Sequence, residues 1–109
     1  SVGGGTGVRG FGLFFLTGNE AVVTSGTFTG GIYTDGTLTM SGGSADLLQL
    51  GYNSGIRVIL SGGSFNSIKI ENGADYQSLL AAGYAYKKQD GAWVKLSEMN
   101  ANTAVTVVE

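Results

Sequence analysis

The expected fold is decided by three short runs of similar sequence: Val22-Val23-Thr24-Ser25-Gly26, Leu38-Thr39-Met40-Ser41-Gly42 and Val58-Ile59-Leu60-Ser61-Gly62. Each run holds residues that favour strands, and each ends in Ser-Gly. The serines that close the runs lie 16 and then 20 residues apart. A repeat of this kind, with loops of variable length, is typical of a β-solenoid in which each turn of the chain stacks on the last.

Stacking would place equivalent side chains in columns. Neighbouring strands lie about 4.8 Å apart, so we expect Val22, Leu38 and Val58 to form one interior column. Glycine after each strand allows the backbone angles that a corner needs, and the chain has no proline to remove a ladder donor. The sequence therefore predicts an all-β fold, a short right-handed parallel β-helix (β-solenoid), over residues 1–73. A β-sandwich is the alternative, because short strands separated by regular turn signals favour it as well.

The last third of the chain, residues 74–109, differs in composition and is expected to cap the open end of the coil. The run Tyr76–Ala82 contains good helix formers and is followed by a glycine, which predicts a helix. Asp90-Gly91 separates two alternating runs, Tyr84–Lys87 and Trp93–Leu96, and this pattern predicts a hairpin. We therefore expect a helix-plus-hairpin cap that forms one folding unit with the rungs.

The composition argues against several classes of function. The 109 residues include 20 glycines and no proline, cysteine or histidine, and the net charge is −2. The chain cannot form disulfides or cysteine-ligated zinc sites, and it lacks the usual general base near neutral pH. The negative charge disfavours a nucleic-acid partner. No apolar stretch reaches the length of about 18 residues that membrane insertion needs.

Two glycine motifs near the start have simple structural explanations. Gly5-Thr6-Gly7-Val8-Arg9-Gly10 matches the dinucleotide fingerprint, but a strand should precede it and a helix should follow. The same run resembles a calcium-binding repeat, except that Arg9 stands where an aspartate ligand belongs. The charged side chains are scattered along the sequence. Asp46 and Arg57 could approach each other on neighbouring rungs, but no cluster of charged residues repeats at matched rung positions. We therefore expect no metal, no cofactor and no enzymatic activity.

The most plausible binding residues lie in the expected cap. They are two tyrosines, two lysines and a tryptophan, namely Tyr84, Tyr86, Lys87, Lys88 and Trp93. Tyrosine and tryptophan are enriched at protein interfaces because they offer a large amphipathic area at low entropic cost. The alternative is that the aromatic rings cover the open end of the coil as core residues.

A resemblance adds to this prediction. Its motifs are Ser61-Gly62-Gly63-Ser64-Phe65-Asn66-Ser67-Ile68, then Ser78-Leu79-Leu80-Ala81-Ala82-Gly83-Tyr84-Ala85-Tyr86, and then Asp90-Gly91 and Trp93-Val94. Over residues 61–96 the chain resembles a β-helix repeat module of large surface proteins of gut Firmicutes, some of which bind immunoglobulin variable domains as superantigens. The resemblance implies an extracellular module on a Gram-positive cell surface or cell wall, one part of a larger multidomain chain. It transfers no ligand-contact residues.

These observations predict a non-enzymatic surface module that recognises a host protein, with immunoglobulin as the specific candidate. One alternative is a structural stalk or adhesin segment. Another is a fragment of a β-helix protein that binds or cleaves a polysaccharide.

Overall fold

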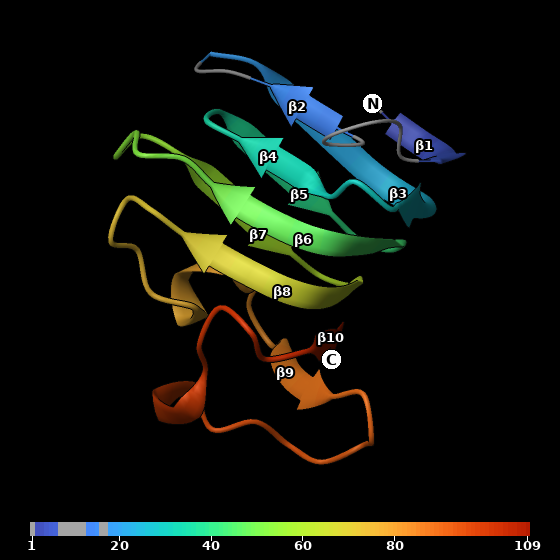
Figure 1. Cartoon of the computed structure of the whole chain (residues 1–109), viewed down its shortest axis with the longest axis vertical. Coiled ribbons are helices and arrows are strands. Elements are labelled where there is room, and N and C mark those ends of the chain that lie inside the picture. Colours follow the sequence, from blue (N-terminus) through green and yellow to red (C-terminus); the bar gives the residue numbers. More distant parts are fainter. Residues whose placement is uncertain (1, 7–12, 16–17) are drawn as a thin grey trace.

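A computed structural model describes residues 2–6, 13–15 and 18–109. The described residues form ten strands in one sheet, together with two short 3-10 turns (Figure 1). The strands are β1 (Val2–Thr6), β2 (Leu13–Phe15), β3 (Glu20–Phe28), β4 (Ile32–Thr34), β5 (Thr37–Met40), β6 (Ser44–Leu50), β7 (Arg57–Leu60), β8 (Ser64–Ile70), β9 (Ala85–Lys88) and β10 (Val105–Val108). The 3-10 turns are η1 (Gln77–Leu79) and η2 (Leu96–Glu98).

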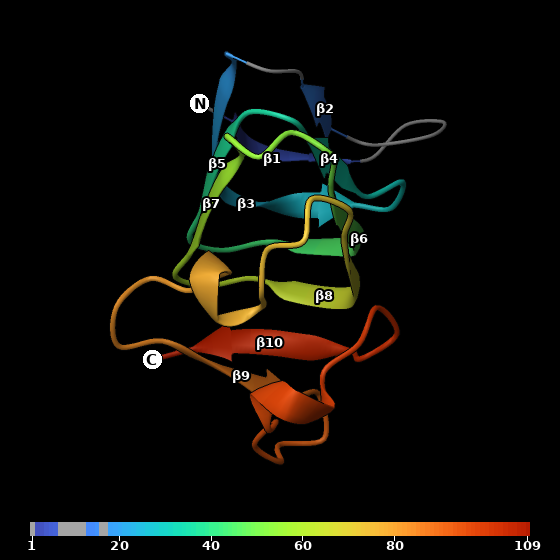
Figure 2. The ribbon, with the colours of Figure 1, turned by 90° about the vertical axis from the view of Figure 1, so that its left-hand side faces the viewer.

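Strands from successive parts of the chain lie one above another in parallel pairs. On one side β5 pairs with both β3 and β7, and on the other β6 pairs with both β4 and β8 (Figure 2). The long strand β3 turns the corner between these sides, since its start pairs with β5 and its end pairs with β6. The sheet therefore curls around an apolar interior.

The register of these layers corrects the expected interior column. Leu38 pairs with Val58, as predicted, but the residue that pairs with Leu38 in β3 is Ala21. Val22 pairs with Thr39 and is 40% exposed, whereas Ala21 is buried. The prediction was wrong for Val22 because the runs were aligned on their Ser-Gly endings. A shift of one residue in a strand reverses the face that each side chain occupies.

The layers are aligned instead by a glycine at the corner. Gly26, Gly43 and Gly63 have φ angles of +109°, +89° and +101°, a region that residues with a Cβ rarely occupy. In the second and third layers the preceding residue is also glycine, Gly42 or Gly62, and there close packing rather than φ excludes a side chain. A Cβ on Gly42 would lie 2.5 Å from the Thr24 carbonyl oxygen, and one on Gly62 would overlap the Ser41 carbonyl oxygen. The corner thus needs glycine for two separate reasons.

The expected helix is wrong, and the reason is a further copy of this corner. Only η1 is helical, and Leu80 instead pairs in parallel with Leu60. The Ala81 N–H donates to the Leu60 carbonyl at 2.9 Å, and Gly83 takes a φ of +84° like the earlier corner glycines. Tertiary pairing therefore overrides the helical propensity of the Leu-Ala-Ala run.

The expected hairpin forms only in part. The segment around Trp93 runs antiparallel to β9 for a short stretch, with a bridge between Lys87 and Trp93. The Lys88 N–H donates to the Ala92 carbonyl, and the Val94 N–H donates to the Tyr86 carbonyl, but the segment forms no second strand. The partner of β9 is β10, which runs antiparallel to β9 on one side and to β8 on the other (Figure 1). The end of the chain therefore inserts between the parallel layers and β9, which local sequence patterns do not reveal.

The predicted right-handed parallel β-helix with a helix-plus-hairpin cap is therefore wrong. The chain forms a mixed sheet with antiparallel strands, which curls into a half-barrel, and no long helix occurs among the described residues. A β-sandwich is not observed either, because the strands belong to one sheet rather than two. The buried core runs through the interior of the curl and includes Phe28, Ile32, Leu48, Phe65 and Ile68.

Candidate functional site

The residues expected to bind a partner lie on β9 and on the segment that follows it. Trp93 is 63% exposed, and the Lys87 ammonium lies 5.0 Å from the centroid of its ring. This is the geometry of a cation–π contact, which is worth about 0.5–1 kcal/mol at an exposed site. Lys88 is exposed beside this pair.

A tight turn holds Trp93 against β9. The Gly91 N–H donates to the Lys88 carbonyl at 2.8 Å, and the Lys88 N–H donates to the Ala92 carbonyl at 2.7 Å. The Asp90 carboxylate accepts from the Ala92 N–H at 3.0 Å, and Gly91 takes a φ of +97°. The predicted turn at Asp90-Gly91 is therefore present, and of the two expected strands only β9 forms.

Tyr86 lies in the core and offers no surface to a partner. Its side chain is 2% exposed, and its hydroxyl donates to the Tyr76 carbonyl oxygen at 2.7 Å. Burial, with smaller contributions from Tyr76 and Asp75, raises the pKa of the Tyr86 phenol well above its ordinary value. The alternative that the aromatic rings of the cap are core residues therefore describes Tyr86.

Tyr84 is half-buried and lines a hollow of about 290 Å³ together with Val94, Leu80 and Leu96. Leu96 is 39% exposed. We use the name Trp93 surface for the exposed or half-buried side chains Lys87, Lys88, Trp93 and Leu96. The structure thus brings Lys87 and Trp93 into contact, leaves Lys88 exposed next to Lys87 in the chain, and buries Tyr86.

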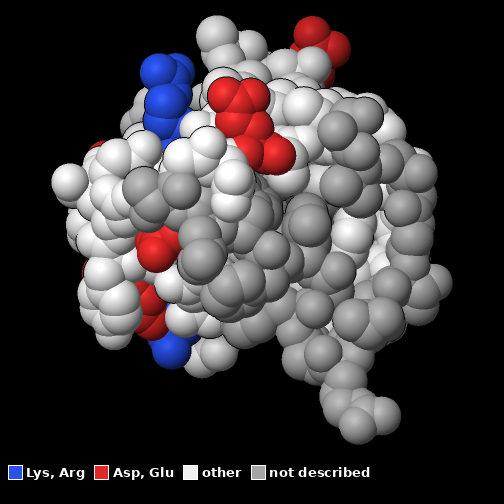
Figure 3. All heavy atoms as spheres, turned by 90° about the horizontal axis from the view of Figure 1, so that it is seen from above, with Lys and Arg blue, Asp and Glu red and all other residues white. Residues whose placement is uncertain are grey.

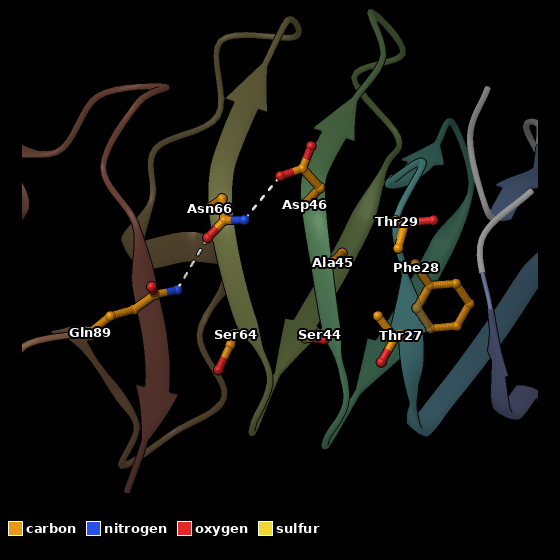
Figure 4. A pocket seen from close by; sticks show the side chains of 9 residues that line it. All are labelled: Thr27, Phe28, Thr29, Ser44, Ala45, Asp46, Ser64, Asn66 and Gln89. Carbon is orange, nitrogen blue, oxygen red and sulfur yellow. Dashed lines mark hydrogen bonds between the residues drawn. The ribbon is translucent and has the colours of Figure 1, made fainter. Parts of the chain in front are cut away.

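A second feature, which sequence reasoning missed, is a groove of about 340 Å³ over β3, β6 and β8 (Figure 4). Polar side chains line it in two rows, on either side of the inward-facing residues of the three strands. One row carries the hydroxyls of Thr27, Ser44 and Ser64, which pair in register from strand to strand. The sequence signal is a repeated pattern in which a hydroxyl residue precedes each buried residue of the corner.

The second row of the groove is hydrogen-bonded. Gln89 Nε2 donates to Asn66 Oδ1 at 3.3 Å, and Asn66 Nδ2 donates to Asp46 Oδ1 at 2.9 Å (Figure 4). All three side chains are exposed. Both amides donate in the same direction along the row, which ends on the Asp46 carboxylate.

Charged side chains are dispersed elsewhere. Seen from the end formed by β1 and β2, the acidic and basic side chains of the described residues do not gather into a patch of one sign (Figure 3). Within residues 2–6, 13–15 and 18–109, no three metal-ligating side chains come together, and no helix has the length and apolar character to cross a membrane. The glycine motif Gly5–Gly10 extends beyond β1 into residues 7–10, which lie outside the described residues.

The chain was compared with known proteins in three ways. No protein-family model matches it, and it has no significant similarity to a curated protein or to a solved structure. Function must therefore be argued from the surface itself.

Proposed function

We propose that this protein is a non-enzymatic binding module that recognises another protein through the Trp93 surface. The observation that carries the proposal is the exposed indole of Trp93, 63% exposed and held under the Lys87 ammonium. Tryptophan is among the residues that are enriched at interface hot spots.

Neighbouring side chains add to the exposed area around Trp93. Leu96, three residues further along the chain, is 39% exposed. Lys87 and Lys88 supply a cationic rim, which favours acidic groups on the partner and a faster encounter at low salt.

The partner to test first is immunoglobulin, and the setting we propose is the outer surface or wall of a bacterium. Both rest on the resemblance of residues 61–96 to surface-protein modules of gut Firmicutes. A stalk segment that only spaces other domains is the alternative, and it needs no exposed anchor residue.

The experiment measures binding of the chain to polyclonal immunoglobulin by biolayer interferometry, in parallel for wild type, Trp93→Ala and Tyr52→Ala. Tyr52 is a matched control because it is an exposed aromatic residue, at 77%, on the loop after β6. Loss of a hot-spot residue costs about 2 kcal/mol or more, so Trp93→Ala should weaken binding about 30-fold while Tyr52→Ala should not change it.

Two results would contradict the proposal. Absence of wild-type binding would remove immunoglobulin as the partner. Equal binding by wild type and Trp93→Ala would remove the Trp93 surface as the site, whatever the partner.

A further inference from the structure

We propose that the groove over β3, β6 and β8 is a second binding site, whose ligand is a short neutral oligosaccharide. The inference does not depend on the Trp93 surface, because it rests on different side chains, those of the two polar rows. The two sites come closest in the sequence where Gln89 of the groove directly follows Lys88 of the Trp93 surface.

The first step of the argument is the chemistry of the lining. The hydroxyls of Thr27, Ser44 and Ser64 can each donate and accept a hydrogen bond, and the amides of Asn66 and Gln89 can do the same. Every sugar hydroxyl has the same double capacity. A metal cation would require several oxygen acceptors without donors, and among the described residues that line the groove only Asp46 carries a formal charge.

The second step is the direction of the hydrogen-bonded row. Because the Gln89 and Asn66 amides both donate toward Asp46, the Asp46 carboxylate receives one amide hydrogen at Oδ1. Its other oxygen has no protein donor among the hydrogen bonds of the described residues and faces an exposed position. A carboxylate so placed is a strong acceptor for a ligand hydroxyl, and it repels anionic ligands.

The third step is the size and the periodicity of the groove. Its volume of about 340 Å³ falls at the lower end of the range of about 300–1,000 Å³ that small-ligand sites occupy. Both rows run across the strands, so polar groups repeat at the strand spacing of about 4.8 Å. An extended sugar chain lying along the rows would present a new set of hydroxyls to each strand in turn.

The hydroxyl row also continues past the parallel layers. Ser64 Oγ lies 2.9 Å from Thr106 Oγ1 on β10, which is antiparallel to β8. This contact holds the Ser64 hydroxyl at one end of the row, and at the other end Thr27 pairs with Thr6 of β1.

The test is a titration of the ¹⁵N-labelled chain with cellohexaose, mannohexaose and maltohexaose, followed by NMR. We expect at least one neutral hexamer to shift the side-chain amide signals of Asn66 and Gln89. Hexagalacturonate serves as an anionic probe and should bind more weakly, because the Asp46 carboxylate repels it.

The variants separate this site from others. Asp46→Ala and Asn66→Ala should each weaken binding of the neutral hexamer about 10-fold, which corresponds to the loss of one hydrogen bond to a charged or polarised group. Glu20→Ala removes a matched exposed carboxylate at the far end of β3 and should have no effect. Trp93→Ala should also leave sugar binding unchanged.

Three outcomes would overturn the inference: no shift with any neutral hexamer, tighter binding of hexagalacturonate than of all neutral hexamers, or full affinity in both groove variants. None of these bears on immunoglobulin binding, so failure here and failure of the proposed function can be told apart.

Discussion

Replacing Gly42 with alanine tests the close stacking of the corners directly. The Gly42 φ angle is not in the left-handed region, so the added methyl group acts through its contacts alone. That methyl carbon would lie 2.5 Å from the Thr24 carbonyl oxygen, about 0.9 Å inside the 3.4 Å at which ordinary contact begins. The obstacle is backbone of the layer above, which cannot rotate away as a flexible side chain could.

The magnitude follows from the cost of overfilling a packed interior. Such changes destabilise by about 1–3 kcal/mol, and the gain of about 0.4–1 kcal/mol that alanine brings by restricting the unfolded chain offsets part of this. We expect a net loss of about 1–2 kcal/mol, which lowers the Tm by about 4–16 °C in a domain of this size. Thermal unfolding followed by far-ultraviolet circular dichroism measures the shift.

Gly55→Ala is the matched control. Gly55 also lacks a left-handed φ, but its added methyl group would meet only the Asn53 side-chain oxygen, at 3.3 Å. We expect a Tm equal to or slightly above that of wild type. If Gly42→Ala has the same Tm as Gly55→Ala, the corners do not approach as closely as the structure has them, and the stacking argument fails.

The remaining predictions test the register, the buried phenol and the exposed indole. Val23→Ala should destabilise the fold by about 1–3 kcal/mol because Val23 is fully buried, whereas Val22→Ala should change the stability by no more than about 0.5 kcal/mol. Urea unfolding measures both, and a larger loss in Val22→Ala than in Val23→Ala would contradict the register. The raised pKa of Tyr86 means that the unfolded chain loses the phenol proton first as the pH passes about 10, so stability should fall above that pH. Tyr86→Phe should lower the free energy of unfolding by about 1 kcal/mol at neutral pH, because the hydrogen bond to Tyr76 is lost. Its stability should then fall less steeply with rising pH than that of wild type, as denaturation at a series of alkaline pH values would measure. Equal slopes for the two proteins would mean that the Tyr86 phenol does not cause the loss. Trp93→Ala should leave the Tm nearly unchanged, since the ring is mostly in solvent, and a large drop would mean that the indole is structural.

Part of the candidate site was predictable and part was not. Trp93, Lys87 and Lys88 could be chosen from composition and turn signals, because Asp90-Gly91 forms its turn through local hydrogen bonds. Tyr86 could not be told from an exposed tyrosine, because its burial depends on packing in the core.

The groove was hidden for a different reason. Ser44, Asp46 and Asn66 look like ordinary loop or strand residues in the sequence, and only the register of β6 against β8 aligns them into rows.

The sequence alone determined the local features of this protein: β-rich runs, glycine corners, and the parallel pairing of Leu38 with Val58. These follow from backbone angles and side-chain shape, which act over a few residues. The tertiary structure alone decided that Ala21 rather than Val22 faces inward, and that β10 lies between β8 and β9. Both outcomes depend on backbone hydrogen bonds and burial between segments far apart in the chain, whose free energy no local pattern contains.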